Sequence, residues 1–224
     1  MGMITHSAKR LLALLAVLLI AVTLCSCGNS GSGSGGGTPE ETEAAPYIKD
    51  PDYTYKGDGF SGFPSLVSFT AKTLDGSSFS PEDLASKDIT VINVWATWCG
   101  PCLNELPDLA AFSRMLPDNI GFITICADGT DDRDNTRSIL AKAGYEGETI
   151  VTGTGSIGNL LASCMYVPTT VFVDKDGTVR NSTVGSPRSN LAGYYLGYLN
   201  DALTAAGCDP IDLPGVEIPE DLYS

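Results

Sequence analysis

The stretch that decides the fold runs from Ile89 to Cys102 and has the sequence ITVINVWATWCGPC. Its first seven residues are rich in β-branched and aromatic side chains, which predicts a buried strand over 89–95. Residues 103–116 carry apolar side chains at helical spacing, which predicts a helix. The cysteines Cys99 and Cys102 therefore lie where a strand leads into a helix. At that place a spacing of i, i+3 puts both side chains on one face, close enough for a short disulfide.

Cys99 is expected to be the reactive thiol of the pair. At a helix N-terminus the unpaired N–H groups and the positive end of the helix dipole stabilise a thiolate and lower the pKa of the thiol. Cys102, one turn further in, should be more buried and act as the resolving thiol that releases a mixed disulfide. Pro101 suits the first helical turn, where its missing N–H would be unpaired, and Gly100 lets a partner backbone approach closely.

Two other uses of a Cys-x-x-Cys pair compete with redox chemistry: a static disulfide and half of a zinc site. The sequence has no second Cys-x-x-Cys to complete a zinc site, and Leu103 after Cys102 excludes the haem attachment pattern. A run of acidic residues further along lacks the spacing and the final glutamate of an EF-hand, so we expect a helix-capping loop and no metal site. These acidic residues are Asp128, Asp131, Asp132 and Asp134.

The chain opens like an exported lipoprotein. Lys9 and Arg10 precede an almost wholly apolar run over 11–25, which is shorter than the roughly 20 residues of a spanning helix and is typical of a signal peptide. Leu24-Cys25-Ser26-Cys27 resembles a lipobox, with leucine three positions and a small residue one position before Cys27. We expect a signal peptide over 1–26 and lipidation of Cys27. Ordinary signal cleavage and an uncleaved anchor are the alternatives.

Removal of residues 1–26 would also remove His6, the only histidine of the chain. Without histidine, Ser-His-Asp and Cys-His catalysis and any His-ligated metal are excluded, so covalent chemistry must rest on cysteine, with carboxylates or water moving protons. The full chain carries a net charge of −14, and loss of Lys9 and Arg10 leaves 11 basic against 27 acidic residues. Binding to nucleic acid, or to anionic lipid through a basic patch, is therefore not expected.

Composition divides the mature chain into three parts. Residues 27–62 begin Gly/Ser-rich and become acidic, which indicates a flexible tether without a core of its own. Residues 63–207 have the composition of one globular domain, long enough to bury a sizeable core. Residues 208–224 are acidic and contain proline, and we interpret them as a peripheral tail.

The order of elements within 63–207 predicts an α/β domain with a mixed sheet, a β-α-β half followed by a β-β-α half. Turn signals at Asp75-Gly76 and Lys175-Asp176-Gly177 predict two hairpins, and Ser80 is a candidate N-cap. The expected strands are 66–70, 77–79, 89–95, 120–126, 169–174 and 178–184. The expected helices are a short one after Ser80, then 103–116, 131–144, 155–164 and 189–206.

The active-site stretch and two later motifs resemble one known family. Residues 93–102 (NVWATWCGPC), then Glu105 and Pro107, then Val167-Pro168-Thr169-Thr170, are closely similar to the TlpA/ResA-like extracytoplasmic branch of the thioredoxin superfamily, over about 63–206. The resemblance implies a thioredoxin fold, in which helices flank a central mixed β-sheet, with an N-terminal β-hairpin extension. It also implies a thiol-disulfide oxidoreductase activity that uses no cofactor.

The same resemblance assigns roles to further residues. It implies that Val167-Pro168 is a cis peptide whose loop faces the two cysteines and docks the substrate chain. With it, Trp98, Gly100 and Pro101 are expected to bind substrate. A cis X-Pro bond costs only about 0.5–1 kcal/mol over trans, so proline suits such a turn. A trans proline opening an edge strand is the alternative.

Glu105 is the third expected catalytic residue. In cytosolic thioredoxins an acid assists the resolving thiol from the strand position that Asn93 occupies here, and an amide cannot take up a proton. Glu105 follows Cys102 by three residues on the same helix face, and in the TlpA/ResA branch a glutamate at this position is associated with the active site. We expect Glu105 to tune the thiol pKa values or relay a proton to Cys102. An ordinary acid near a helix N-terminus is the equal alternative.

Three cysteines remain once the signal region and the redox pair are assigned: Cys126, Cys164 and Cys208. Cys126 ends the expected strand 120–126, and Cys164 ends the helix that leads to Pro168, so both should lie near the active-site edge of the sheet. They could form a second disulfide or remain buried thiols that pack as small apolar residues. Cys208 follows the last helix and has no assigned role.

Taken together, the sequence predicts an extracytoplasmic, membrane-tethered oxidoreductase that works as a reductase. The resemblance implies a CcdA/DsbD-like membrane electron donor and, as clients, apocytochrome c, a methionine sulfoxide reductase or other secreted thiol proteins. A thiol peroxidase of the peroxiredoxin group is the enzymatic alternative, although Ala96 stands where that group requires threonine. A binding lipoprotein with a fixed disulfide is the non-enzymatic alternative.

Overall fold

A fully buried strand, β3 (Ile89–Trp95), runs through the sheet of this protein, and all seven of its residues are inaccessible to solvent. Strand β4 (Ile120–Cys126) pairs with it in parallel on one side, and β6 (Thr169–Asp174) pairs with it antiparallel on the other. These three strands have the bounds that their apolar, β-branched sequences predict. In this register Asn93 lies opposite Thr170, which places two polar side chains in the middle of the core.

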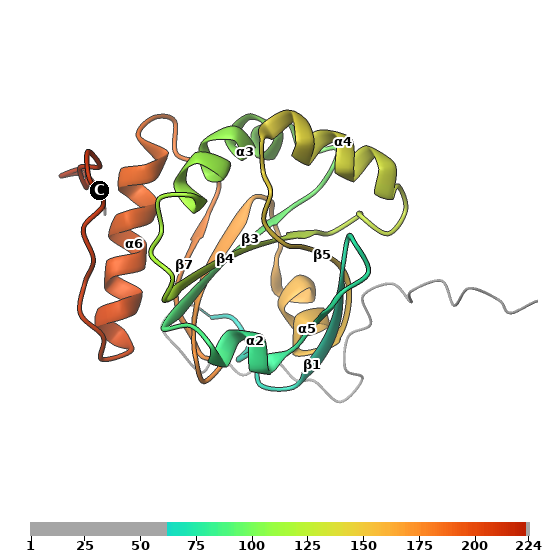
Figure 1. The fold of residues 1–224 in the computed structure, drawn as a ribbon, viewed down its shortest axis with the longest axis horizontal. Coiled ribbons are helices and arrows are strands. Elements are labelled where there is room, and N and C mark those ends of the chain that lie inside the picture. The colour runs from blue at the N-terminus through green and yellow to red at the C-terminus, as the bar shows by residue number, and fades with distance from the viewer. Residues whose placement is uncertain (1–61, 223–224) are drawn as a thin grey trace, which may run out of the picture. The chain divides into compact units, whose positions relative to one another are not determined.

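The computed structural model describes residues 62–222, so the expected signal peptide, the lipidation site Cys27 and nearly all of the tether lie outside the described residues. Seven strands form one mixed sheet in the order β2-β1-β5-β4-β3-β6-β7 (Figure 1). The remaining strands are β1 (Phe69–Thr73), β2 (Ser78–Phe79), β5 (Thr149–Gly155) and β7 (Val179–Val184). The helices are α2 (Pro81–Ala85), α3 (Gly100–Ser113), α4 (Arg133–Ala143), α5 (Ser156–Ser163) and α6 (Leu191–Ala205).

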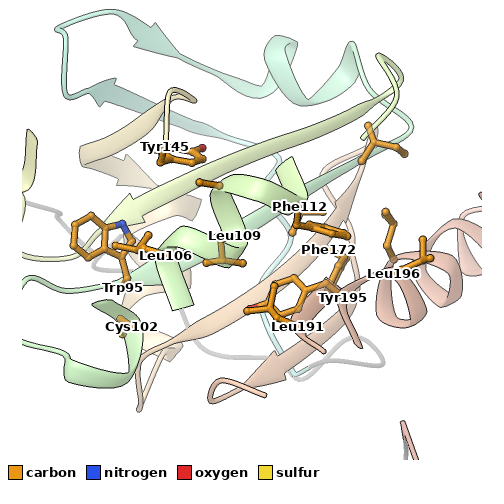
Figure 2. Close-up of a cluster of buried hydrophobic side chains, with 14 of the residues drawn as sticks. Trp95, Cys102, Leu106, Leu109, Phe112, Tyr145, Phe172, Leu191, Tyr195 and Leu196 are labelled. Atoms are coloured by element: carbon orange, nitrogen blue, oxygen red, sulfur yellow. The ribbon is translucent and has the colours of Figure 1, made fainter. Parts of the chain in front are cut away.

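Helices cover both faces of the sheet (Figure 1). Apolar side chains of α3, α4 and α6 pack on one face, in the cluster that Figure 2 shows around Phe112 and Tyr195. Leu84 of α2 and Ile157 and Leu160 of α5 pack on the other face. Burying both faces removes the apolar area of the central strands from water, which is the main favourable contribution to folding.

The sheet departs from the sequence prediction at its β1–β5 end. Strand β1 begins at Phe69 and not at Leu66, because the alternating pattern of Phe69–Thr73 puts three side chains into the core. Strand β5, which joins the β1–β2 hairpin to β4, was not expected at all. Its sequence, TIVTGTG, contains two glycines and resembles a loop before a helix. Gly155 is required there, since its φ of +66° suits glycine and an added Cβ would lie 2.4 Å from the Ser68 carbonyl oxygen.

The described part of the C-terminal segment, 208–222, lies along α6. The Asn200 side chain hydrogen bonds to both backbone polar groups of Ile211, and Tyr194 donates to Asp221 at 2.9 Å. Leu213 is buried against the core. Gly193 lets the segment approach closely, because an added Cβ would lie 2.2 Å from the carbonyl oxygen of Glu217. The acidic tail of the sequence analysis is thus a packed part of the domain surface.

Candidate active site

Cys99 and Cys102 form a disulfide at the start of α3. Cys99 is the N-cap residue of the helix, and Pro101 lies in its first turn, as the sequence predicts. The backbone N–H of Cys102 donates a hydrogen bond to Cys99 Sγ at 3.2 Å. Both cysteines are buried, but Cys99 retains 4% of its accessible surface and Cys102 retains none.

The Val167–Pro168 peptide bond is cis, as the family resemblance implies. The Val167 carbonyl oxygen lies 3.5 Å from Cys99 Sγ, although the two residues are 68 positions apart in sequence. Pro168 leads directly into β6, which pairs with β3, the strand that ends just before the redox pair. The pairing of these two strands therefore sets the cis-proline loop against the disulfide.

Large apolar side chains are exposed in the two loops that carry the redox pair and the cis proline. Trp98 is 74% exposed, and Met165 and Tyr166, which precede the cis proline, are 81% and 70% exposed. Beside them lies a hollow of about 460 Å³ whose lining includes Trp98, Cys164 and Val167. The sequence analysis expected Trp98 to bind substrate. It did not name Met165 and Tyr166 as candidate binding residues, because two adjacent apolar residues in a loop form no recognisable sequence pattern. Exposed apolar surface of this kind is typical of interaction sites.

Gly100 and Pro101 are both exposed at the tip of the active-site turn. An added Cβ at Gly100 would meet no atom within 4 Å, so the surrounding protein leaves that side open. Any need for glycine there must come from a partner that approaches the turn from outside.

Glu105 is buried, with only 3% of its surface exposed. Its Oε1 accepts a hydrogen bond from Asn93 Nδ2 at 3.0 Å. Its Oε2 has no hydrogen-bond partner among the described residues. Burial raises the pKa of Glu105 to about 7, and the side chains of Ser186 and Asn93 counteract part of this rise. The carboxyl group can therefore gain or lose a proton near neutral pH.

A chain of buried polar groups extends from Glu105 across the core. Asn93 Nδ2 also donates to Thr170 Oγ1 at 3.0 Å, and Thr170 Oγ1 lies 2.9 Å from the Tyr195 hydroxyl. Tyr195 is fully buried on α6. The sequence analysis missed Thr170 and Tyr195 as members of the site. The register of β3 against β6 could have indicated Thr170, but no local signal indicates Tyr195.

Asp128 holds the loop that precedes the redox pair. Its carboxylate accepts hydrogen bonds from the backbone N–H of Thr97 at 2.9 Å and from the Thr97 hydroxyl at 2.5 Å. The Cys126 thiol donates to the same carboxylate at 3.3 Å. Burial alone would raise the pKa of Asp128, but these hydrogen bonds outweigh it and the net pKa is lowered. Asp132, from the same acidic run, caps α4, as expected for a capping loop.

Cys126 and Cys164 do not form a disulfide with each other. The Cys126 thiol is fully buried and bonds to Asp128, whereas Cys164 packs against the apolar cluster on the opposite face of the sheet. Burial raises the pKa of both thiols to about 12. Of the two alternatives that the sequence left open, the structure has two thiols and no second disulfide, with Cys126 buried and Cys164 half-buried. Cys208 is half-buried and packs beside the core.

The sequence matches the Redoxin family over residues 61–195. The chain belongs to the Redoxin family. The relatives include the thioredoxin-like protein YneN of Bacillus subtilis, 27% identical over 135 residues that cover 60% of this chain and 78% of that protein. The thiol-disulfide oxidoreductase ResA of Bacillus anthracis is 27% identical over 132 residues, which cover 56% of this chain and 72% of that protein.

Among solved structures, a thiol:disulfide interchange protein from Chlorobium tepidum matches at 23% identity with a TM-score of 0.48, covering 64% of this chain and 96% of that chain. The fold is thioredoxin-like, with a mixed sheet flanked by helices, as the sequence predicts. The protein is a thiol-disulfide oxidoreductase of this family, with its Cys99–Cys102 pair at disulfide distance. Over residues 62–222, no helix is long and apolar enough to cross a membrane.

Proposed function

We propose that the protein reduces disulfides in client proteins, with Cys99 as the nucleophile and Cys102 as the resolving thiol. The different surroundings of the two cysteines carry this proposal. Cys99 keeps a small exposed area, caps a helix and accepts the N–H of Cys102, which would stabilise a thiolate there. Cys102 is fully buried and beyond the reach of a client sulfur.

The reaction balances as two sulfur exchanges. The Cys99 thiolate attacks one sulfur of a client disulfide, a bond forms between them, and the other client sulfur leaves as a thiolate that takes a proton from water. Cys102 then loses its proton and attacks Cys99 Sγ. The Cys99–Cys102 disulfide forms, and the second client sulfur leaves. The client gains two electrons and the enzyme dithiol loses two.

Glu105 is proposed as the acceptor of the Cys102 proton. A fully buried thiol cannot hand its proton directly to bulk water, and Glu105 follows it by one helical turn with a pKa of about 7. A carboxylate of that pKa is poised to take up a proton in one step and release it in the next near neutral pH. Asn93, at the strand position, has an amide that cannot take this role.

Client recognition is proposed to use the loop residues on both sides of Cys99. Trp98, Gly100 and Pro101 form one side, and Val167 with cis Pro168 forms the other. The exposed Met165 and Tyr166 extend this surface, and the hollow of about 460 Å³ offers room for an apolar client side chain.

The direction and place of the reaction are proposals that rest on sequence. The Gly-Pro dipeptide between the cysteines resembles that of reducing thioredoxins, whose reduction potentials are roughly −270 mV. The oxidant DsbA has a much higher reduction potential, roughly −120 mV, so the dipeptide favours the reducing direction. With a signal peptide over 1–26 and a lipid on Cys27, the domain would be tethered outside the cytoplasm. There a CcdA/DsbD-like membrane donor would recharge it. Clients would be apocytochrome c, a methionine sulfoxide reductase or other secreted thiol proteins.

The test is insulin reduction by the full chain with an electron source, together with trapping by Cys102→Ser. We expect turnover by the wild type and the Cys208→Ser control, none by Cys99→Ser, and a covalent client adduct only in Cys102→Ser. Mass spectrometry of the adducts would identify the clients. If Cys99 and Cys102 do not undergo thiol-disulfide exchange with dithiothreitol or oxidised glutathione, the proposal is ruled out. That result would favour a scaffold protein with a fixed disulfide.

A further inference from the structure

The hollow beside the redox pair is built from separate segments of the chain. Trp98 comes from the loop between β3 and α3, Ala127 follows the end of β4, and Val167 belongs to the loop that precedes β6. The hollow has a volume of about 460 Å³. Its width depends on how firmly these loops are held against one another.

Asp128 joins two of these segments. It follows Ala127 directly, and its carboxylate accepts two hydrogen bonds from Thr97, the residue before Trp98. The Thr97 N–H donates at 2.9 Å and the Thr97 hydroxyl at 2.5 Å. An ionised carboxylate has no proton to donate, so the direction of both bonds is settled. Asp128 therefore ties the Trp98 side of the hollow to the Ala127 side.

The turn that carries Asp128 is itself anchored to the sheet. The Cys126 thiol donates to Asp128 Oδ1 at 3.3 Å, and the Gly129 N–H donates to the Cys126 carbonyl oxygen at 3.1 Å. The Thr130 hydroxyl donates to the carbonyl oxygen of Val151, on β5, at 2.6 Å. Gly129 allows this close packing, because an added Cβ would lie 2.9 Å from Cys126 Cβ. The carboxylate is thus presented to Thr97 from a fixed position.

The Trp98 side of the hollow depends on this anchor. Trp98 is 74% exposed, so packing restrains its ring little, and the backbone on either side decides where the ring lies. The Cys99 N–H closes this turn by donating to the Ala96 carbonyl oxygen at 3.1 Å. Thr97 lies inside the turn, and its two bonds to Asp128 attach the turn to the end of β4.

We propose that Asp128 and Thr97 are positioning residues that fix the width of this hollow, and that they thereby favour clients with a large apolar side chain next to the disulfide cysteine. This inference deepens the proposed function and rests on it. Without the Asp128–Thr97 bonds, the Trp98 loop moves away from Ala127, and a client side chain in the hollow loses contact area. The free energy of apolar binding falls with that area.

The test compares two disulfide peptides as substrates of the full chain. Both have the same sequence and carry glutathione on their single cysteine, but one has Phe and the other Ala beside that cysteine. Second-order rate constants are measured for oxidation of the pre-reduced protein. The wild type should react about tenfold faster with the Phe peptide, since the ring buries more apolar surface. Asp128→Ala and Thr97→Val should each lower this ratio about three- to tenfold.

Two further variants are the controls. Thr97→Ser keeps the hydroxyl and should keep the wild-type ratio. Asp131→Ala is an exposed change three residues from Asp128 and should keep it too. Because both rate constants come from the same protein, a general loss of stability or of Cys99 reactivity lowers both and leaves their ratio unchanged.

The possible outcomes separate this inference from the proposed function. A wild-type ratio near one, an unchanged ratio in whichever of Asp128→Ala and Thr97→Val folds, or an equal fall in Asp131→Ala overturns the inference, while the chemistry of Cys99 and Cys102 stands. Failure of the wild type to react with either peptide overturns the proposed function, and the inference with it.

Discussion

The backbone N–H of Cys102 donates to the Sγ of Cys99, so in the proposed mechanism the residue that resolves the mixed disulfide also stabilises the sulfur that forms it. The first turn of α3 thus supplies a hydrogen-bond donor for Cys99 Sγ and a fully buried position for Cys102. Cys126, Cys164 and Cys208 differ from this pair, because none of them is the N-cap residue of a helix.

The first prediction concerns selective thiol reactivity. In the reduced full chain at pH 7, iodoacetamide should alkylate Cys99 first and leave Cys126 and Cys164 intact. Burial raises the pKa of these two thiols to about 12, so only about 10⁻⁵ of each is thiolate at that pH. A brief alkylation pulse followed by peptide mass spectrometry measures the order. Labelling of Cys126 as fast as Cys99 would contradict the assignment.

The second prediction is a pH dependence of stability that belongs to Glu105. Its pKa is about 7 in the folded protein against 4.5 for an exposed glutamate. Its neutral form is thus favoured by folding. The stability it contributes is complete below about pH 4.5 and is lost as the pH rises to about 7, by about 3 kcal/mol at most.

Urea denaturation of the oxidised full chain between pH 4 and 8 measures this dependence. Glu105→Gln should be less sensitive to pH over that window, and the two proteins should differ most above pH 7, where the wild type carries a buried charge. Parallel stability curves for the two proteins would show that Glu105 is not held neutral by burial.

The third prediction concerns the Asp128 carboxylate that holds Thr97. Asp128→Asn removes the charge and one acceptor, and should lower the free energy of unfolding by about 1 kcal/mol, a modest value because the site is partly exposed. Asp131→Asn, an exposed change three residues away, is the control and should have little effect. Since the pKa of Asp128 is lowered by folding, the difference from wild type should vanish as the pH falls into the range where Asp128 is protonated. A difference that persists in acid would argue against the ionic contact.

The fourth prediction tests the packing of residues 208–222 on α6. Gly193→Ala would place a methyl group 2.2 Å from the carbonyl oxygen of Glu217, and should destabilise the protein by about 1–3 kcal/mol. The segment should then be cut more readily in limited proteolysis. In a chain that ends at residue 207, the part of the penalty that comes from the Glu217 carbonyl should disappear, while the part that comes from Asn190 Nδ2, 2.4 Å from the added Cβ, should remain. If Gly193→Ala lowers the free energy of unfolding equally in the full and the shortened chain, the cause lies within α6 itself.

The sequence predicts the centre of this fold well and its edges less well, for a physical reason. Strands β3 and β4 are buried on both faces, so their residues are apolar along the whole length and the pattern is unambiguous. Strand β5 ends in alternating threonine and glycine, and its identity depends on pairing with β1, whose partner residues are 77 to 86 positions away in sequence. Local propensity contains no information about such a distant partner.

The same distinction holds at the site. The Cys99–Cys102 pair and the cis Pro168 were recognised because they occupy short motifs. Tyr195 was not, because its place beside Thr170 depends on how α6 packs on the sheet. Glu105 was found by helix spacing together with the family resemblance, but its burial, and with it the raised pKa, follows from the tertiary structure.

The exposed apolar rim around Cys99 has a consequence for the behaviour of the protein at high concentration. Three large apolar side chains, Trp98, Met165 and Tyr166, face water, and two copies could associate through them. The chain carries a net charge of −14, which makes such copies repel one another. Salt should weaken that repulsion, so concentrated solutions of the protein should self-associate more readily as ionic strength rises.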